Sequence, residues 1–224
     1  MALFIVATPI GNLGDMTYRA VETLQRVDLI AAEDTRTSRK LCNKYEIETP
    51  MTSFHAHSSE GELAKLIGKL KEGKDVALIS DAGTPGISDP GYRLVTAAIE
   101  AGIQISPVPG CSAVITALSA SGLPTDKFLY FGFLPLKKGR QTLFASLKDE
   151  KRTAVFYESV HRIGKTLAQL TEALGGERRV VVARELTKMH EEFFRGTLAE
   201  AVAWSEGKTM KGEFVVLLGG TDLA

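Results

Sequence analysis

Short apolar runs alternate, over the first half of the chain, with longer stretches in which apolar residues recur every three or four positions. Short apolar runs are typical of buried strands, and the longer spacing is typical of amphipathic helices. Strands that alternate with helices favour an α/β fold with a mainly parallel sheet, because helical crossovers join parallel strands. The predicted strands cover residues 3–7, 28–32, 51–54, 75–79 and 104–108.

Helix start signals precede several of the periodic stretches. Asp15 is expected to cap the first helix, and Ser59 and Glu62 have the spacing of a capping box. Asp89 suits the N-cap of the helix after the fourth predicted strand, with Pro90 in its first position. Each signal places a helix between two strands, as a parallel arrangement requires.

The second half of the chain has predicted strands with fewer helices between them. A basic turn at residues 134–140 leads into a helix that extends to about Asp149. Ser159 is expected to cap a further helix, which Gly175 ends. Neighbouring strands outnumber crossovers here, which indicates a mixed sheet. The strands are predicted at residues 128–133, 153–157, 179–183, 192–197 and 213–218.

The length of 224 residues allows one large domain or two small ones. The segment from Gly122 to Lys127 is the best candidate linker, because the chain becomes richer in aromatic residues after it. We therefore predict a first α/β domain over residues 1–122, a linker at 123–127 and a second α/β domain over 128–224.

Composition and charge narrow the function classes. The hydrophobic content of 44% and charged content of 24% are those of an ordinary globular protein, and no apolar run is long enough to span a membrane. The N-terminus lacks a signal-peptide pattern, and Cys42 and Cys111 have no metal or redox spacing, which favours a reducing cytoplasm. The formal net charge of zero argues against non-specific nucleic-acid binding. No metal site is expected.

A loop rich in glycine, proline and aspartate follows the strand at 75–79 and covers residues 80–91. In an open parallel sheet, ligands bind at the carboxyl ends of the strands. Asp89 is accounted for as a helix cap, but Asp81 has no such role. Asp81 is therefore a candidate acceptor for ligand hydroxyls or an ammonium group, although a solvated turn aspartate is the alternative.

Six segments, in order and at sensible spacing, are together similar to one known family. They are Ala-Thr-Pro-Ile-Gly-Asn-Leu-Gly-Asp at 7–15, Ala-Glu-Asp-Thr-Arg at 32–36, Ser-Asp-Ala-Gly-Thr-Pro at 80–85, Phe-Tyr-Glu-Ser-Val-His-Arg at 156–162, Ala-Arg-Glu-Leu-Thr-Lys at 183–188 and Gly-Glu-Phe-Val-Val at 212–216. Over nearly its whole length the chain resembles the bacterial methyltransferases that 2′-O-methylate a cytidine ribose of small-subunit ribosomal RNA. These belong to the tetrapyrrole-methylase superfamily.

The resemblance implies two αβα domains with S-adenosylmethionine in the cleft between them, and a homodimer. It implies the assembled small ribosomal (30S) subunit as substrate. Longer members continue past the last strand into a helical region thought to help bind RNA, whereas this sequence stops at Ala224, so that region is not expected here. Asp81 and, by the same resemblance, seven further residues are expected to contact the cofactor: Ile10, Thr84, Ala113, Val114, Tyr157, Ala183 and Glu213.

A ribose 2′-hydroxyl is a poor nucleophile, so a base or a cation near the developing alkoxide is expected. The candidates are Glu33 and Arg36 after the second predicted strand, and Glu185 and Lys188 in the second half. Lys188 with a lowered pKa would accept the proton, and Glu185 would orient it. Alternatively, Arg36 and Glu185 form a structural ion pair.

Two groups of basic residues are candidate RNA contacts. Arg36, Arg39 and Lys40 recur at helical spacing on one face. The turn contributes Lys137, Lys138 and Arg140. Phosphate binding is the functional interpretation, and a solvated helix face is the alternative.

Two further functions remain open. A methylase of a tetrapyrrole or another small molecule would share the fold, and a binding module would keep the cofactor fold without turnover. The segments around Glu33 and His161 are specific to the ribosomal RNA family and favour RNA methylation.

Overall fold

The computed structural model describes residues 1–89, 91–207 and 210–223. Its contacts divide the chain into two compact units, Met1–Ser112 and the residues from Ala113 onward. The sequence placed the boundary at residues 123–127. In the structure, helix α5 (Ala113–Ser119) belongs to the second unit, where it packs against a strand of that unit's sheet.

The first unit has a five-stranded sheet with the order β3-β2-β4-β1-β5. All of its strand pairs are parallel, as the alternating pattern predicted. The carboxyl ends of the strands therefore meet at one edge of the sheet. The strands are β1 (Leu3–Val6), β2 (Leu29–Ala32), β3 (Met51–Ser53), β4 (Val76–Ile79) and β5 (Ile105–Val108).

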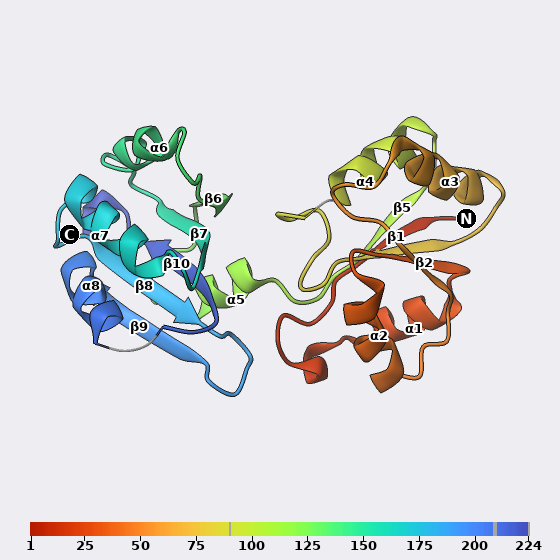
Figure 1. Ribbon diagram of the computed structural model, residues 1–224, viewed down its shortest axis with the longest axis horizontal. Helices are drawn as coiled ribbons and strands as arrows, with labels where there is room; N and C mark the ends of the chain where they lie inside the picture. The colour runs from red at the N-terminus through yellow and green to blue at the C-terminus, as the bar shows by residue number, and fades with distance from the viewer. Residues whose placement is uncertain (90, 208–209, 224) are drawn as a thin grey trace. The chain divides into compact units, whose positions relative to one another are not determined.

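Helices cover both faces of this sheet. On one face lie α1 (Tyr18–Arg26) and α2 (Thr35–Lys44), and on the other lie α3 (Glu60–Lys71) and α4 (Gly91–Glu100), as Figure 1 shows. Each face has its own apolar core. All four residues of the central strand β4 are buried, which explains why this strand is a continuous apolar run and not an alternating one.

The helix caps confirm part of the sequence analysis. Ser59 and Glu62 form the predicted capping box of α3. The prediction for Asp15 is wrong: Asp15 lies in a short helix, η1 (Leu13–Asp15), and the Thr17 side chain caps α1 instead. The Asp89 carboxylate accepts a hydrogen bond from the first residue of α4 at 3.0 Å. Pro90 lies outside the described residues.

The second unit has a five-stranded sheet with the order β6-β7-β10-β8-β9. The β6–β7 pair is parallel and the other pairs are antiparallel, which confirms the mixed sheet. The strands are β6 (Phe128–Phe133), β7 (Thr153–Ser159), β8 (Arg179–Arg184), β9 (Glu192–Thr197) and β10 (Glu213–Leu218).

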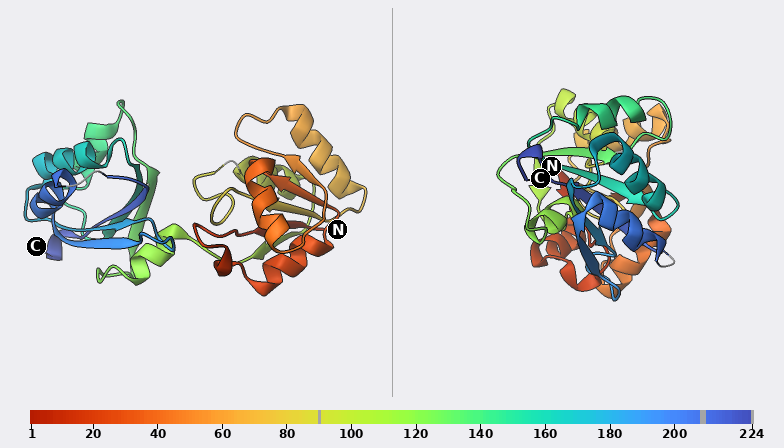
Figure 2. Two further views of the ribbon diagram at one scale, coloured as in Figure 1. Left: turned by 60° about the horizontal axis from the view of Figure 1, so that its bottom comes forward. Right: turned by 90° about the vertical axis from the view of Figure 1, so that its left-hand side faces the viewer.

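The helices of the second unit show where the sequence analysis fell short. The prediction that Ser159 caps a helix is wrong, because Ser159 ends β7 and α7 starts four residues later without a side-chain cap. No helix was predicted between β9 and β10, but in the structure α8 lies there and packs beside α7 (Figure 2). Besides α5, the described part of this unit has the helices α6 (Arg140–Ser146), α7 (Ile163–Leu174), α8 (Leu198–Glu206) and η2 (Thr221–Leu223).

Candidate active site

The loops after β1, β4 and β5 are joined around Gly83 in the first unit. Thr8 and Gly83 exchange two backbone hydrogen bonds of 2.9 and 3.0 Å. Gly83 has a φ of 85°, and the Ile10 side chain lies 3.5 Å from the point where a Cβ at Gly83 would stand. The Thr84 hydroxyl donates to the carbonyl of Cys111 at 3.0 Å. The structure therefore brings the predicted cofactor residues Ile10 and Thr84 to the same edge of the sheet.

Two carboxylates from β2 and β4 meet beside this loop. The amide of Asp34 donates to Oδ1 of Asp81 at 3.1 Å, and the amide of Asp81 donates to Oε2 of Glu33 at 3.3 Å. Partial burial raises the pKa of both Glu33 and Asp81, and a neighbouring carboxylate raises each further. Asp81 stays exposed to solvent. This arrangement fits a carboxylate that is held in place by its neighbours and remains open to a ligand.

Arg36 is engaged within its own loop. Its guanidinium forms an ion pair of 2.8 Å with Asp34, and the side chain is 90% exposed. Hydrogen bonds from the Arg36 side chain and backbone hold the pKa of Asp34 at about 2. Asp34 also caps α2. Arg36 thus helps to fix the start of α2, and its exposed guanidinium stays accessible to a large substrate.

Three neighbouring strands of the second unit align two of the cofactor residues predicted there, Tyr157 and Ala183. Tyr157 of β7 lies opposite Val215 of β10, which lies opposite Ala183 of β8. Ala183 and Val114 are buried, whereas Tyr157 is half-buried. Burial and a hydrogen bond with Tyr130 raise the pKa of the Tyr157 phenol, so the phenol stays neutral. The row forms an apolar wall with one polar group.

The loop after β8 holds Lys188 between two carboxylates. Its ammonium lies 2.8 Å from Glu185 and 2.8 Å from Glu213. Glu185 and Thr187 have positive φ values of 50° and 64°, which L-residues rarely adopt. A Cβ at Gly212 would fall 2.4 Å from the Glu185 side chain, so only glycine leaves room for it. Strained residues held by such a network are typical of functional sites.

The lowered pKa predicted for Lys188 is wrong. Partial burial works to lower the pKa of the ammonium, but the hydrogen bonds to Glu185 and Glu213 outweigh it, and the net shift is upward. The same ion pair lowers the pKa of Glu185. This direction favours a cationic Lys188 at neutral pH over a proton-accepting one.

The structure also contradicts the prediction that Arg140 contacts RNA. Arg140 is only 8% exposed, because its guanidinium donates to Thr166 at 2.6 Å, to Gln169 at 2.9 Å and to the carbonyl of Pro135 at 3.1 Å. Thr166 in turn donates to the buried Glu158 at 2.7 Å. The other predicted RNA contacts, Arg39, Lys40, Lys137 and Lys138, are exposed.

Glu158 was not among the predicted site residues, but in the structure it is the centre of a buried hydrogen-bonded network. This carboxylate is fully buried and forms an ion pair of 2.8 Å with Arg162, four residues later. It also accepts a hydrogen bond from the amide of Ser159 at 2.8 Å. The spacing of Glu158 and Arg162 was visible in the sequence as a possible pair, but the partners Arg140 and Thr166 come from other elements.

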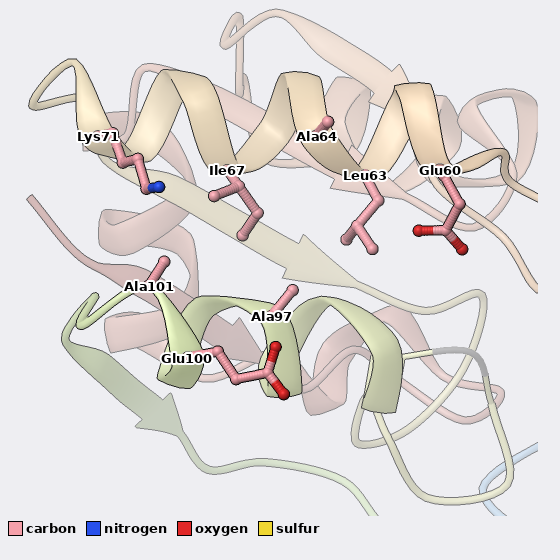
Figure 3. A pocket seen from close by; sticks show the side chains of 8 residues that line it. All are labelled: Glu60, Leu63, Ala64, Ile67, Lys71, Ala97, Glu100 and Ala101. Atoms are coloured by element: carbon pink, nitrogen blue, oxygen red, sulfur yellow. The ribbon is translucent and has the colours of Figure 1, made fainter.

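A pocket of about 330 Å³ lies between α3 and α4 (Figure 3). Leu63, Ile67 and Ala97 face into it, with Glu60 and Lys71 near its ends. None of its lining residues belongs to the loops that carry the predicted cofactor residues.

In the part of the chain that the structure describes, no helix is long and apolar enough to cross a membrane.

Comparisons with known proteins show the family to which the chain belongs. Residues 2–202 match the family model described as Tetrapyrrole (Corrin/Porphyrin) Methylases. A protein of Synechocystis sp. named ribosomal RNA small subunit methyltransferase I is 55% identical over 219 residues, with 97% of this chain and 78% of that protein covered. The Thermotoga maritima protein of the same name is 50% identical over 220 residues, with 98% and 99% covered.

Among solved structures, uroporphyrin-III-C-methyltransferase from Thermus thermophilus matches with a TM-score of 0.67 and 20% identity. The match covers 97% of this chain and 94% of that chain. At this identity the likeness extends to the fold alone. The Thermotoga relative, by contrast, is matched over almost its full length.

Proposed function

Because the chain belongs to the tetrapyrrole (corrin/porphyrin) methylase family, we propose that it is an S-adenosylmethionine-dependent methyltransferase that methylates the 2′-hydroxyl of a cytidine ribose in small-subunit ribosomal RNA. The observation that carries this proposal is the identity of 50–55%, over nearly the whole chain, to relatives named ribosomal RNA small subunit methyltransferase I. The small-molecule methyltransferase from Thermus thermophilus is only 20% identical, which favours RNA over a tetrapyrrole substrate.

The residues present fit the methyl donor. The donor has an ammonium group and ribose hydroxyls that need acceptors, and an adenine ring that needs an apolar surface. Asp81 is exposed, and the amide of Asp34 holds one of its oxygens in place. Gly83 leaves a space that a Cβ would fill beside Ile10. We propose that Asp81 accepts from the donor and that Ile10 and Thr84 position it.

The second unit supplies the apolar surface. Tyr157 and Ala183 belong to the row described above, and Glu213 lies two residues before Val215 on β10 with an exposed carboxylate. Ala183 and Val114 are buried, whereas Tyr157 is half-buried and Glu213 is exposed. We propose that the row packs against the donor and keeps water away from the reacting groups.

The donor supplies a methyl group on a sulfonium centre, which is already activated for displacement. The protein's task is therefore to orient the hydroxyl and to stabilise the charge that develops on its oxygen. Lys188 is a cation held by Glu185 and Glu213, and we assign it the stabilising role. Glu33 is the proposed proton acceptor, because partial burial makes its carboxylate more basic than usual.

The proposed substrate is the assembled 30S subunit, and the protein is proposed to act in the cytoplasm as a homodimer. The formal net charge of zero provides no overall attraction to RNA. Local contacts with an assembled ribosomal surface would compensate for this. Exposed Arg36, Arg39 and Lys40 on α2 are proposed to contact phosphates.

Calorimetric titration with S-adenosylmethionine and a methylation assay on unmodified small subunits test the proposal. We expect micromolar cofactor binding and one new 2′-O-methylcytidine in the ribosomal RNA. Cofactor binding without methyl transfer to any substrate would indicate the binding module. Transfer to a tetrapyrrole but not to RNA would indicate a small-molecule methylase, and absence of cofactor binding would overturn all three functions.

A further inference from the structure

The loop between β6 and α6 exposes apolar and basic side chains side by side. Leu136 is 77% exposed and Phe133, at the end of β6, is 58% exposed. Lys137 and Lys138 follow directly and are exposed as well. Single exposed apolar side chains are common, but several of them gathered beside positive charges are typical of an interaction surface.

Two arginines, the buried Arg140 and the half-buried Arg162, hold the backbone of this loop. Arg140 donates to the carbonyl of Pro135 at 3.1 Å, and Arg162 donates to the carbonyl of Leu134 at 3.2 Å. Both guanidiniums are anchored through the buried Glu158, Arg162 directly and Arg140 through Thr166. Leu134 itself is buried in the core of the second unit. The tip is therefore fixed in a conformation that presents its side chains outward, which lowers the entropy cost of binding a partner.

The loop begins at the proposed donor site. Two aromatic rings of β6 lie beside the Tyr157 ring of β7. The centroid of the Phe133 ring is 5.3 Å from that of Tyr157, and the centroid of the Tyr130 ring is 5.4 Å from it. A ligand on Phe133 would thus adjoin the residue proposed to pack against the donor. This position favours a substrate over a partner that acts elsewhere.

We propose that the β6–α6 loop is a pre-formed RNA-binding element of the second unit. Lys137 and Lys138 bind backbone phosphates, and Phe133 and Leu136 pack against a base or ribose near the methylated nucleotide. Aromatic side chains stack on unpaired bases, and lysines attract phosphates without reading sequence. This inference rests on the proposed function, since it assigns the surface through which the same site receives its substrate.

The test compares two double variants with the same change in charge. K137E/K138E alters the loop, and K65E/K69E alters two exposed lysines on α3 of the first unit. For K137E/K138E we expect the KM for small subunits to rise about tenfold or more. The slope of log KM against log salt should also fall by roughly 1 to 2, because each phosphate contact contributes ~0.7–0.9. Cofactor affinity by calorimetry and the behaviour of K65E/K69E should match the wild type.

The outcomes separate this inference from the proposed function. A wild-type enzyme that methylates subunits, with KM and salt slope unchanged in K137E/K138E, overturns the inference and leaves the function intact. A wild type that transfers no methyl group overturns the function, and filter binding of small subunits to both double variants then decides on the loop. Equal loss in both double variants also overturns the inference, because the effect would then reflect charge alone. Loss of binding to anionic vesicles, with subunit binding unchanged, would assign the loop to a membrane.

Discussion

Asp81 is bonded to the neighbouring β2 loop through its amide and through one carboxylate oxygen. The loop thus fixes the direction of the carboxylate while leaving it exposed. Asp81→Asn should weaken S-adenosylmethionine binding about 10- to 100-fold, because a charged acceptor for a ligand ammonium is worth ~1.5–3 kcal/mol. Calorimetry measures this directly.

The matched control is Asp89→Asn in the same loop. Asp89 accepts hydrogen bonds from the amides of Gly86 and Gly91, and asparagine keeps an oxygen for them. Cofactor affinity should therefore stay within about twofold of the wild type. Equal weakening in both variants would mean that the loop's conformation, and not the Asp81 charge, determines binding.

Lys188 gives the second residue-scale prediction. Lys188→Met should lower the single-turnover rate about 10²–10³-fold, because a preorganised cation near the developing alkoxide is lost. Lys188→Arg should recover part of that rate. Cofactor affinity should change little in either variant, and unchanged turnover in Lys188→Met would remove Lys188 from the reaction.

The pH dependence of the rate tests the same assignment. The pKa of Lys188 is raised, so the cation is present below the ordinary value of 10.5 and is lost only as pH rises through the higher folded value. We expect no loss of rate attributable to Lys188 as pH falls from about 9 to 7. A proton-accepting lysine with a lowered pKa would instead lose activity in that range, and Lys188→Arg would remove this limb of the profile.

At the residue scale, the sequence predicts what lies at strand ends but not what tertiary contacts bury. Asp81 and Lys188 lie in the loops that follow β4 and β8, and both side chains form hydrogen bonds in the structure. Arg140, by contrast, reads as part of a basic turn with Lys137 and Lys138. Its burial depends on Thr166 and on Gln169, which lie 26 and 29 residues away in sequence. Local pattern carries no information on such partners.

At the level of elements, the spacing of apolar residues and the helix-capping residues account for most of the helices and strands that could be predicted. Thr197 and Glu200 form a capping box at the start of α8, with the same spacing as Ser59 and Glu62 at α3. The signal for α8 was therefore present in the sequence. The first cap was misplaced because Asp15 and Thr17 both have capping side chains, and only the backbone path of η1 decides between them.

The buried network between β7, α6 and α7 gives an element-scale prediction. Glu158 is fully buried and joins Arg162 to the Thr166–Arg140 pair. Glu158→Gln should lower the free energy of unfolding of the second unit by about 3–5 kcal/mol, because breaking a buried pair leaves charge uncompensated. Urea unfolding followed by fluorescence of Trp204, the single tryptophan of the chain and part of α8, measures it.

Asp222→Asn is the control in the same unit. Asp222 forms a surface ion pair of 3.8 Å with Lys151, and its side chain is 66% exposed. Surface pairs contribute ~0–1 kcal/mol, so this variant should unfold close to the wild type. A Glu158→Gln variant as stable as Asp222→Asn would show that the network does not hold the β6–α6 loop in place.

At the scale of the whole molecule, the two sheets follow from the sequence because their strands differ in context. The first sheet is buried on both faces and reads as uninterrupted apolar runs, as in β4. The second has neighbouring antiparallel strands, as the succession of runs indicated. The assignment of α5 to the second unit depends on its packing against β10, which no local signal reports.

The balance of charge leads to the last prediction. The chain has 27 basic and 27 acidic residues, so long-range attraction to RNA phosphates is absent and only local groups such as Lys137 and Lys138 contribute. A naked RNA fragment offers phosphates but not the assembled surface that would supply further contacts. We expect kcat/KM on assembled 30S subunits to exceed that on naked small-subunit RNA by about tenfold or more at 150 mM salt.

The comparison is made with both substrates carrying the same unmodified nucleotide, at 50 and 150 mM salt. Lower salt should raise the rate on naked RNA more than the rate on subunits, since phosphate contacts are the larger share of its binding. Equal rates on both substrates at both salt concentrations would contradict the prediction. The local basic groups would then suffice, and the ribosomal surface would contribute nothing to recognition.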